Sequence, residues 1–227
     1  MIVRYVCSPL VVPPELSAIR GVIFDCDGVL VDSRDANRMY YNLIRERMGL
    51  LSMTPEEEDY VHTHSVAQSL ARVVPPQRLA EAHALRRAFD YRDILPYVYL
   101  EPGLRELLVL LRQKNVRMGV LTNRTDTMEL VLETFDLGLF FSLVITAGRL
   151  SHPKPSPEGL HRIMANWGLD RSQVAYIGDS ALDERSARTA GVAFWAYKNP
   201  ALLATMHVPD YESLRLCLRQ ALPDPGE

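Results

Sequence analysis

Residues 21–33, which read GVIFDCDGVLVDS, decide the fold. The first four are apolar, and a short apolar run that ends in polar residues is typical of a strand buried inside a parallel sheet. Asp25 and Asp27 follow this run directly, and Gly28 allows a sharp turn after them. We therefore predict a buried strand with two carboxylates at its carboxyl end, which is the edge where open α/β sheets bind ligands.

Further apolar runs repeat this character along the rest of the chain. Between them lie segments with helical spacing, such as Leu104, Leu107, Leu108 and Leu111 on one helix face. Alternation of short strands with helices predicts a doubly wound, Rossmann-like parallel α/β sheet. The additional predicted strands are residues 118–121, 143–145, 174–177 and 192–195.

One interval, residues 33–95, breaks the alternation because it has helical patterns and no good strand. Thr54 and Ser65 are suitable N-cap residues within it, and Ser33 is suitable at its start. We expect this insertion to cover the carboxyl end of the first strand. The predicted units are an α/β catalytic core formed by residues 1–33 and 98–227, and an all-helical cap formed by residues 34–97.

The composition excludes several classes of function. The 227 residues include 25 Lys plus Arg and 28 Asp plus Glu, which gives a net charge of −3 and no basic footprint for nucleic acid. The three cysteines form no CxxC pair, so we expect neither a disulfide framework nor structural zinc. The sequence has no apolar run long enough for a transmembrane helix. We predict a cytoplasmic protein with no nucleic-acid or membrane partner.

Three later motifs carry polar groups at the ends of predicted strands. Thr122 and Asn123 follow one strand, and Asp179 and Asp183 follow another. Lys154 lies between two prolines and is one of only three lysines in the chain. Each group alone could be a helix cap, a turn residue or a solvated charge. All of them together, each at a strand end, indicate one shared site.

With these motifs in this order, the sequence resembles the haloacid dehalogenase superfamily of aspartyl phosphohydrolases. The resemblance covers about residues 19–215, and residues 1–18 have no counterpart in it. The matching stretches are residues 25–33 for the first motif, Thr122 for the second, Lys154 for the third, and residues 178–180 with Asp183 for the fourth.

The resemblance implies a Mg²⁺-dependent phosphatase that forms an aspartyl-phosphate on Asp25 and acts on a small phosphorylated metabolite. Asp27 would protonate the leaving alcohol and then activate water. The implied catalytic residues are Asp25, Asp27, Thr122 and Lys154. The implied phosphate-binding residues are Thr122, Asn123 and Lys154. The implied metal ligands are Asp25, Asp27 through its backbone carbonyl, Asp179, and Asp183 directly or through water.

Other chemistries of this superfamily compete with hydrolysis. The dehalogenases lack the second acid of the first motif, because their reaction has no leaving alcohol to protonate, so the presence of Asp27 disfavours that activity. The related phosphonate-cleaving enzymes form a Schiff base on a lysine of the cap, and the lack of lysine between Ser33 and Leu95 excludes that mechanism. β-Phosphoglucomutase shares all four motifs, but residues 64–70 lack the arginine of its cap signature. The sequence at 122–124 favours the phosphoglycolate phosphatase branch. A non-catalytic phosphate-binding module on the same fold is a further alternative, and neither the substrate nor the oligomeric state is predicted.

Two further features suggest chemistry that we do not expect, namely a histidine metal site and a redox-active cysteine. His62 and His64 resemble a metal-binding pair, but residues two apart on a helix do not share a face. Cys26 should point away from the site, because side chains alternate along a strand. We expect the histidines to serve the structure or the substrate side of the cap, and Cys26 to pack in the core.

Overall fold

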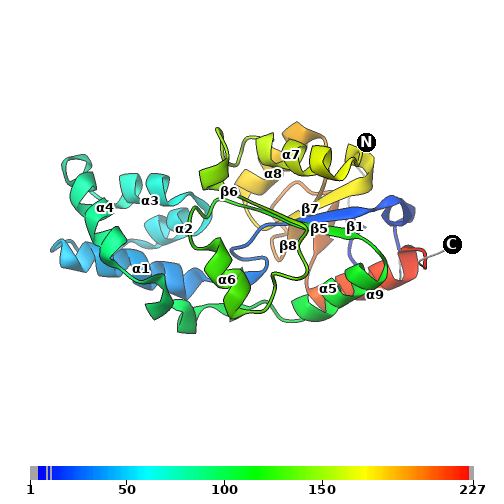
Figure 1. Cartoon of the computed structure of the whole chain (residues 1–227), viewed down its shortest axis with the longest axis horizontal. Coiled ribbons are helices and arrows are strands. Elements are labelled where there is room, and N and C mark those ends of the chain that lie inside the picture. Colours follow the sequence, from blue (N-terminus) through cyan, green and yellow to red (C-terminus); the bar gives the residue numbers. More distant parts are fainter. Residues whose placement is uncertain (1–4, 9, 11, 225–227) are drawn as a thin grey trace.

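The computed structural model describes residues 5–8, 10 and 12–224. At its centre is a seven-stranded sheet in the order β1-β9-β8-β7-β2-β5-β6, with every neighbouring pair parallel (Figure 1). The doubly wound α/β prediction is confirmed, and all five predicted strands are present. The strands are β1 Tyr5–Val6, β2 Gly21–Phe24, β5 Arg117–Thr122, β6 Leu143–Thr146, β7 Val174–Gly178, β8 Ala193–Tyr197 and β9 Met206–Val208.

Helices cover both faces of the sheet, because side chains of each strand alternate between two hydrophobic clusters. Val22 and Phe24 pack with one group of helices, whereas Ile23 between them packs with the other. The first group is α5 Leu104–Gln113, α6 Met128–Thr134 and α9 Tyr211–Ala221, and the second is α7 Glu158–Trp167 and α8 Ala181–Ala190 (Figure 1). Short 3₁₀ turns lie at Pro14–Ala18, Ala147–Arg149 and Arg171–Gln173.

Residues 34–97, here called the helical insertion, extend away from the sheet at its carboxyl edge (Figure 1). They have their own hydrophobic cluster, with Tyr40, Ile44 and Leu70 buried in it. Capping boxes begin two of the helices, at Thr54 and at Ser65, as the sequence indicated. The insertion contains α1 Arg34–Arg47, α2 Pro55–Thr63, α3 Val66–Val73 and α4 Leu79–Ala88, with 3₁₀ turns at Pro76–Arg78, Tyr91–Asp93 and Leu95–Tyr97.

The chain enters and leaves the helical insertion through a two-stranded antiparallel ribbon. Its strands are β3 Val31–Asp32 and β4 Tyr99–Leu100, with Val31 opposite Leu100 and Asp32 opposite Tyr99. The two crossings from sheet to insertion therefore lie side by side. The division of the chain into two domains remains a prediction, and this ribbon supports it.

The three cysteines are free and buried. Cys26 packs in the hydrophobic core between sheet and helices, which confirms its predicted direction. Cys7, after β1, contacts Cys217 of α9 with a distance of 3.2 Å between their Sγ atoms. This contact joins the first strand to the last helix.

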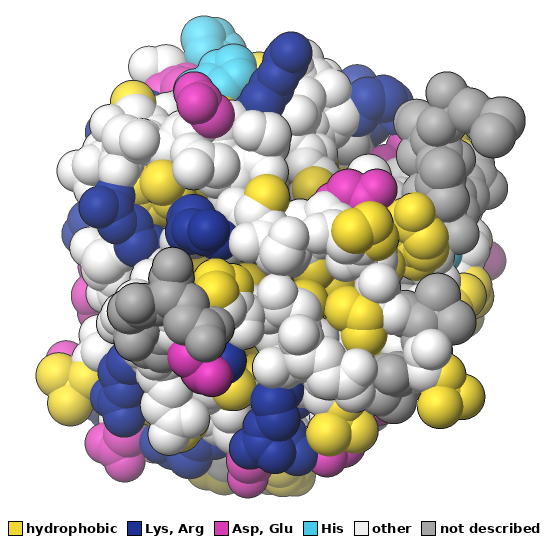
Figure 2. Space-filling model, turned by 90° about the vertical axis from the view of Figure 1, so that its right-hand side faces the viewer, with side chains coloured by type: hydrophobic (Ala, Val, Ile, Leu, Met, Phe, Trp, Pro, Cys, Tyr) yellow, Lys and Arg dark blue, Asp and Glu magenta, His cyan; other side chains and the backbone are white. Residues whose placement is uncertain are grey.

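The end of the sheet remote from the helical insertion is shown in Figure 2, where charged and apolar side chains are interspersed. A cavity of about 350 Å³ at the starts of the edge strands is lined mainly by apolar side chains, including Leu16, Trp195 and Met206. The acidic motifs gather at the opposite end. Among the described residues, no helix is long and apolar enough to cross a membrane.

Candidate active site

Lys154 lies at the centre of the site and bridges two carboxylates. Its Nζ is 2.7 Å from Oδ1 of Asp25, directly after β2, and 2.7 Å from Oδ1 of Asp183 in α8. All three residues are buried. Removing a lysine ammonium from water is costly unless anions surround it, and these two carboxylates hold the pKa of Lys154 above its usual value despite burial. The third and fourth motifs thus meet the first.

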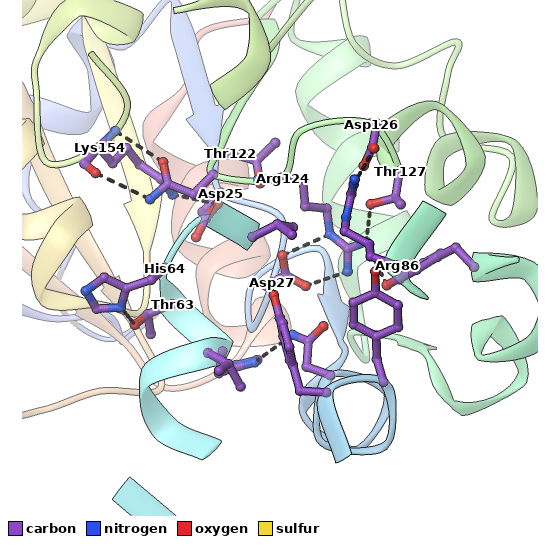
Figure 3. Close-up of a pocket in the computed structure, with 18 residues that line it drawn as sticks. Asp25, Asp27, Thr63, His64, Arg86, Thr122, Arg124, Asp126, Thr127 and Lys154 are labelled. Carbon is purple, nitrogen blue, oxygen red and sulfur yellow. Dashed lines mark hydrogen bonds and ion pairs between the residues drawn. The ribbon is translucent and has the colours of Figure 1, made fainter. Parts of the chain in front are cut away.

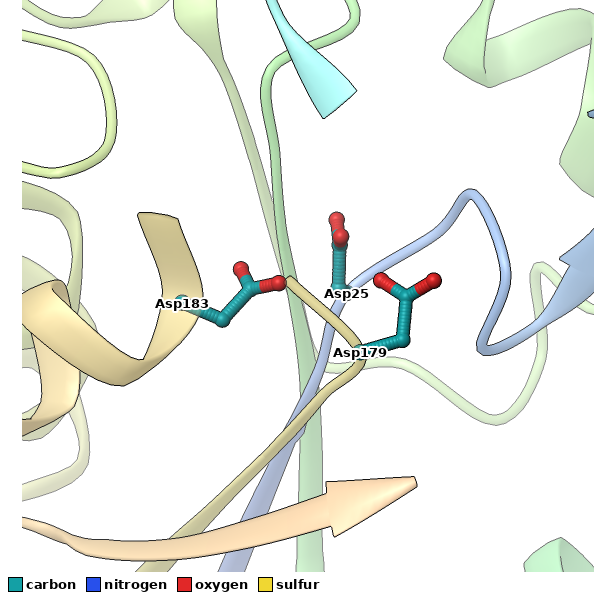
Figure 4. Close-up of side chains that lie close together, drawn as sticks. All are labelled: Asp25, Asp179 and Asp183. Atoms are coloured by element: carbon teal, nitrogen blue, oxygen red, sulfur yellow. The ribbon is translucent and has the colours of Figure 1, made fainter. Parts of the chain in front are cut away.

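Asp25, Asp179 and Asp183 form an acidic cluster beside this lysine. Figure 4 shows the three carboxylates converging from β2, from the end of β7 and from α8, with oxygens within 4.8 Å of one another. Burial raises the pKa of Asp25 to about 7, helped by Asp183 and opposed by Lys154. Burial and the neighbouring carboxylates also raise the pKa of Asp179 well above its usual value. Three acids facing one ammonium leave negative charge for a cation to offset.

The donor set fits a divalent cation of the magnesium type, because every group offered is an oxygen. Asp179 is the most available ligand, since its carboxylate accepts no hydrogen bond from the described part of the chain. Asp183 is different. Its carboxylate already accepts hydrogen bonds from Lys154, Tyr176 and Ser180. The geometry supports Asp25 and Asp179 as direct ligands, and Asp183 as the residue that positions the lysine.

Thr122 and Asn123 lie where β5 ends, both buried. Asn123 is bound to the backbone of Lys154: its Oδ1 accepts from the Lys154 N–H at 3.1 Å, and its Nδ2 donates to the Lys154 carbonyl at 3.4 Å. Thr122 Oγ1 accepts from the backbone N–H of Arg124 at 3.1 Å. Asn123 was predicted to bind phosphate, and here its amide fixes the loop that carries Lys154.

Asp27 is held by Arg124, a residue that the sequence analysis used only to choose a branch of the family. The guanidinium grips both carboxylate oxygens, with Nε 2.9 Å from Oδ2 and Nη2 2.6 Å from Oδ1. Burial by itself would raise the pKa of Asp27, but Arg124 and the Ser33 hydroxyl offset burial and bring that pKa below its usual value. This arrangement favours the ionised form of Asp27.

Ser33 is the N-cap residue of α1, as predicted, but its side chain makes no capping hydrogen bond. The hydroxyl donates to Asp27 Oδ1, which is a charge-assisted hydrogen bond. Ser33 therefore also belongs to the site, a role that the sequence did not indicate.

A small cavity of about 60 Å³ lies between these groups and the helical insertion (Figure 3). Asp25, Asp27 and Lys154 face it. The rest of its lining comes largely from the insertion, so a molecule bound there contacts both parts. The lining residues are Asp25, Asp27, Asn37, Tyr40, Tyr41, Val61, His62, Thr63, His64, Val66, Arg86, Tyr91, Thr122, Asn123, Arg124, Asp126, Thr127 and Lys154.

A larger groove of about 780 Å³ opens on the other side, beside Asp179. Gly28, Arg34 and Lys198 also line it. His62 and His64 reach both cavities, but His64 stacks on Tyr60 with ring centroids 3.7 Å apart. Among the described residues, the acidic cluster is the one group of three or more possible ligands close enough together to hold a metal ion.

The fold and site define an α/β protein with an acidic, lysine-bearing centre beneath a helical insertion. Residues 22–197 match the family of haloacid dehalogenase-like hydrolases, and the chain belongs to that family.

Individual relatives are similar over most of the chain. A phosphoglycolate phosphatase of Chromobacterium violaceum is 31% identical over 188 residues, covering 79% of this chain and 85% of that protein. One from Pseudomonas savastanoi is 31% identical over 183 residues, and the match spans 66% of its length and 76% of this chain. The crystal structure of a subfamily IA hydrolase from Geobacter sulfurreducens has a TM-score of 0.72 at 38% identity, over 87% of this chain and 95% of that one.

Proposed function

We propose that the protein is a magnesium-dependent phosphatase that hydrolyses a small phosphorylated metabolite of the phosphoglycolate type through an aspartyl-phosphate on Asp25. The observation that carries the proposal is the convergence of Asp25, Lys154 and Asp179 at one sheet edge, with Asp27 facing the same cavity. The hydrolase family and its phosphoglycolate phosphatase relatives support phosphatase chemistry.

In the first step the Asp25 carboxylate would attack phosphorus while the ester P–O bond breaks. The leaving oxygen would take a proton from Asp27, which faces the cavity where the alcohol would lie. This step needs the protonated carboxyl, which the pair with Arg124 disfavours before substrate binds. Lys154 and Thr122 would hold the phosphoryl oxygens. Magnesium, bound by Asp25, Asp179 and the Asp27 carbonyl, would neutralise charge between two anions.

In the second step Asp27, now ionised, would accept a proton from water as the water attacks the aspartyl-phosphate. Inorganic phosphate would leave, and the Asp25 carboxylate would be restored. The pair of Asp27 with Arg124 favours the ionised carboxylate, which is the form that this step needs. Arg124 is therefore assigned to the hydrolysis of the intermediate.

The relatives and the sequence of the helical insertion support a phosphoglycolate-type substrate over the hexose phosphate of a mutase. Two relatives are phosphoglycolate phosphatases, and residues 64–70 lack the arginine of the mutase cap signature.

The test compares Asp25→Asn and Asp27→Asn with the wild type, using phosphate release from 2-phosphoglycolate in the presence of Mg²⁺. Loss of a covalent nucleophile should lower turnover by several orders of magnitude. Loss of the proton carrier should lower it by about 10²–10⁴-fold, with a phosphoryl mass increment trapped on Asp25. Asp136→Asn, at an exposed position with φ of 50°, serves as the control and should keep wild-type activity.

Two results would contradict the proposal. Phosphate release by Asp25→Asn at an appreciable fraction of the wild-type rate would exclude the nucleophile. Conversion of β-glucose 1-phosphate to the 6-phosphate without net phosphate release would assign the chain to the mutases instead. A wild-type protein that binds phosphate but releases none from any ester would be a binding module.

A further inference from the structure

Arg86, from α4 of the helical insertion, lines the same cavity as Asp27 (Figure 3). Its side chain is 19% exposed, and it forms an ion pair with Asp126 on the loop after β5. The sequence analysis assigned no role to this residue. It is one of three cationic side chains around the cavity, the others being Lys154 and Arg124.

The donors of the other two cations are engaged. Lys154 holds Asp25 and Asp183, and Arg124 donates from Nε and Nη2 to Asp27 and from Nη1 to Tyr91 and Thr127. Arg86 is different, because its Nε is buried and has no hydrogen-bond partner among the described residues. A buried donor without an acceptor is unfavourable, so the guanidinium of Arg86, which lines the cavity, has one hydrogen bond still to make.

We propose that Arg86 is the specificity residue that binds an anionic group, of the carboxylate kind, on the leaving alcohol of the substrate. The inference rests on the proposed function, since Asp27 would mark where the alcohol oxygen lies and Arg86 lines the same small space. A planar guanidinium matches a carboxylate well. The substrate class is therefore a short phosphomonoester whose alcohol carries a carboxylate.

Asp126 is the partner that such a carboxylate would replace or join. Its side chain is 56% exposed, so it can turn to solvent without becoming a buried unpaired charge. The pair keeps Arg86 extended toward the cavity, and the free Nε leaves one donor that Asp126 does not use.

The experiment compares 2-phosphoglycolate with ethyl phosphate, which lacks the carboxylate. The measured quantity is the ratio of kcat/KM for the two substrates in wild type, Arg86→Met and Arg86→Lys. Loss of a charge-assisted hydrogen bond should lower this ratio by roughly 10–100-fold in Arg86→Met, with partial recovery in Arg86→Lys. The matched control is Arg87→Met, because Arg87 is the next residue on α4 and is exposed.

The outcomes separate this inference from the proposed function. If the wild type cleaves both esters and Arg86→Met lowers both equally, Arg86 is structural and the inference fails while the phosphatase proposal stands. If the wild type releases phosphate from neither ester, the proposed function fails. Arg86 is then judged by binding: the rise in melting temperature caused by 2-phosphoglycolate, relative to ethyl phosphate, must shrink in Arg86→Met but not in Arg87→Met.

Discussion

Burial of the Asp25 carboxyl group lowers the stability of the folded protein when the group is ionised. Its pKa of about 7 lies above the ordinary value of 3.8, chiefly because the side chain is buried. The folded protein therefore binds more protons than the unfolded chain between these two values, and its stability falls as pH rises through that interval. Above pH 7 the ionised carboxylate continues to cost free energy.

A first prediction follows for the metal-free protein. Asp25→Asn should raise the free energy of unfolding at pH 8 by up to about 4 kcal/mol, as a shift of roughly three pKa units allows, and should change it little at pH 4. Urea unfolding in the presence of a chelator at both pH values measures the effect. A destabilised variant at pH 8 would show that the Lys154 ion pair outweighs the cost of burial.

At the scale of the elements, the turn between β2 and β3 adjoins the acidic cluster. Gly28 has φ of 74°, and a Cβ added there would overlap the carboxylate of Asp179. Gly49 has a similar φ of 67° at the end of α1, but nothing lies near the place of its Cβ. Both glycines thus have a left-handed backbone conformation, but only Gly28 adjoins the site.

This pair gives a second prediction, tested by calorimetric titration with Mg²⁺ and by thermal unfolding. Gly28→Ala and Gly49→Ala should each lose about 1–2 kcal/mol of stability from the left-handed backbone. Only Gly28→Ala should bind Mg²⁺ at least 10-fold more weakly, because Asp179 is displaced. Equal magnesium affinity in the two variants would mean that Asp179 is not a ligand.

The sequence predicted the elements whose signals are local. Each predicted strand is an apolar run, and the polar residues that follow Phe24, Leu121 and Ile177 meet because parallel strands end at one edge. The short strands β1 and β9 escaped prediction because two or three residues show no period.

The contacts that the sequence could not predict are made by long side chains across the fold. Arg124 reaches Asp27 over 97 positions, and Arg86 reaches Asp126 from another part of the chain. The Arg86 pair depends on how the helical insertion packs on the sheet. Arg124 and Asp27 instead follow the neighbouring strands β5 and β2, but residue type alone does not show that their side chains pair. The contact of Ser33 with Asp27 could not be predicted either, although the two residues are close in sequence. A serine suits both a helix N-cap and a hydrogen bond to a carboxylate, so the residue type does not show which contact its hydroxyl makes.

At the scale of the whole molecule, the helical insertion and the sheet have separate hydrophobic clusters. Replacing residues 34–97 with a short glycine–serine linker should therefore leave a folded core, because β3 and β4 already lie side by side. We expect the shortened protein to hydrolyse p-nitrophenyl phosphate slowly and to lose its preference for 2-phosphoglycolate.

Far-ultraviolet circular dichroism and cooperative unfolding check the fold of that shortened protein, and the ratio of the two activities checks the role of the insertion. An unfolded product would show that the sheet needs contacts such as that of Tyr91, which packs against both clusters. A folded product with unchanged preference would assign selectivity to the core.

The β3–β4 ribbon also has a consequence for how such a protein can diversify. Because both crossings lie at one seam only two residue pairs long, a recombination event at that seam exchanges the whole insertion and leaves Asp25, Lys154 and Asp179 in place. Under the proposed function, phosphoryl chemistry and substrate choice would then change independently, because a different insertion would leave the proposed catalytic residues unaltered.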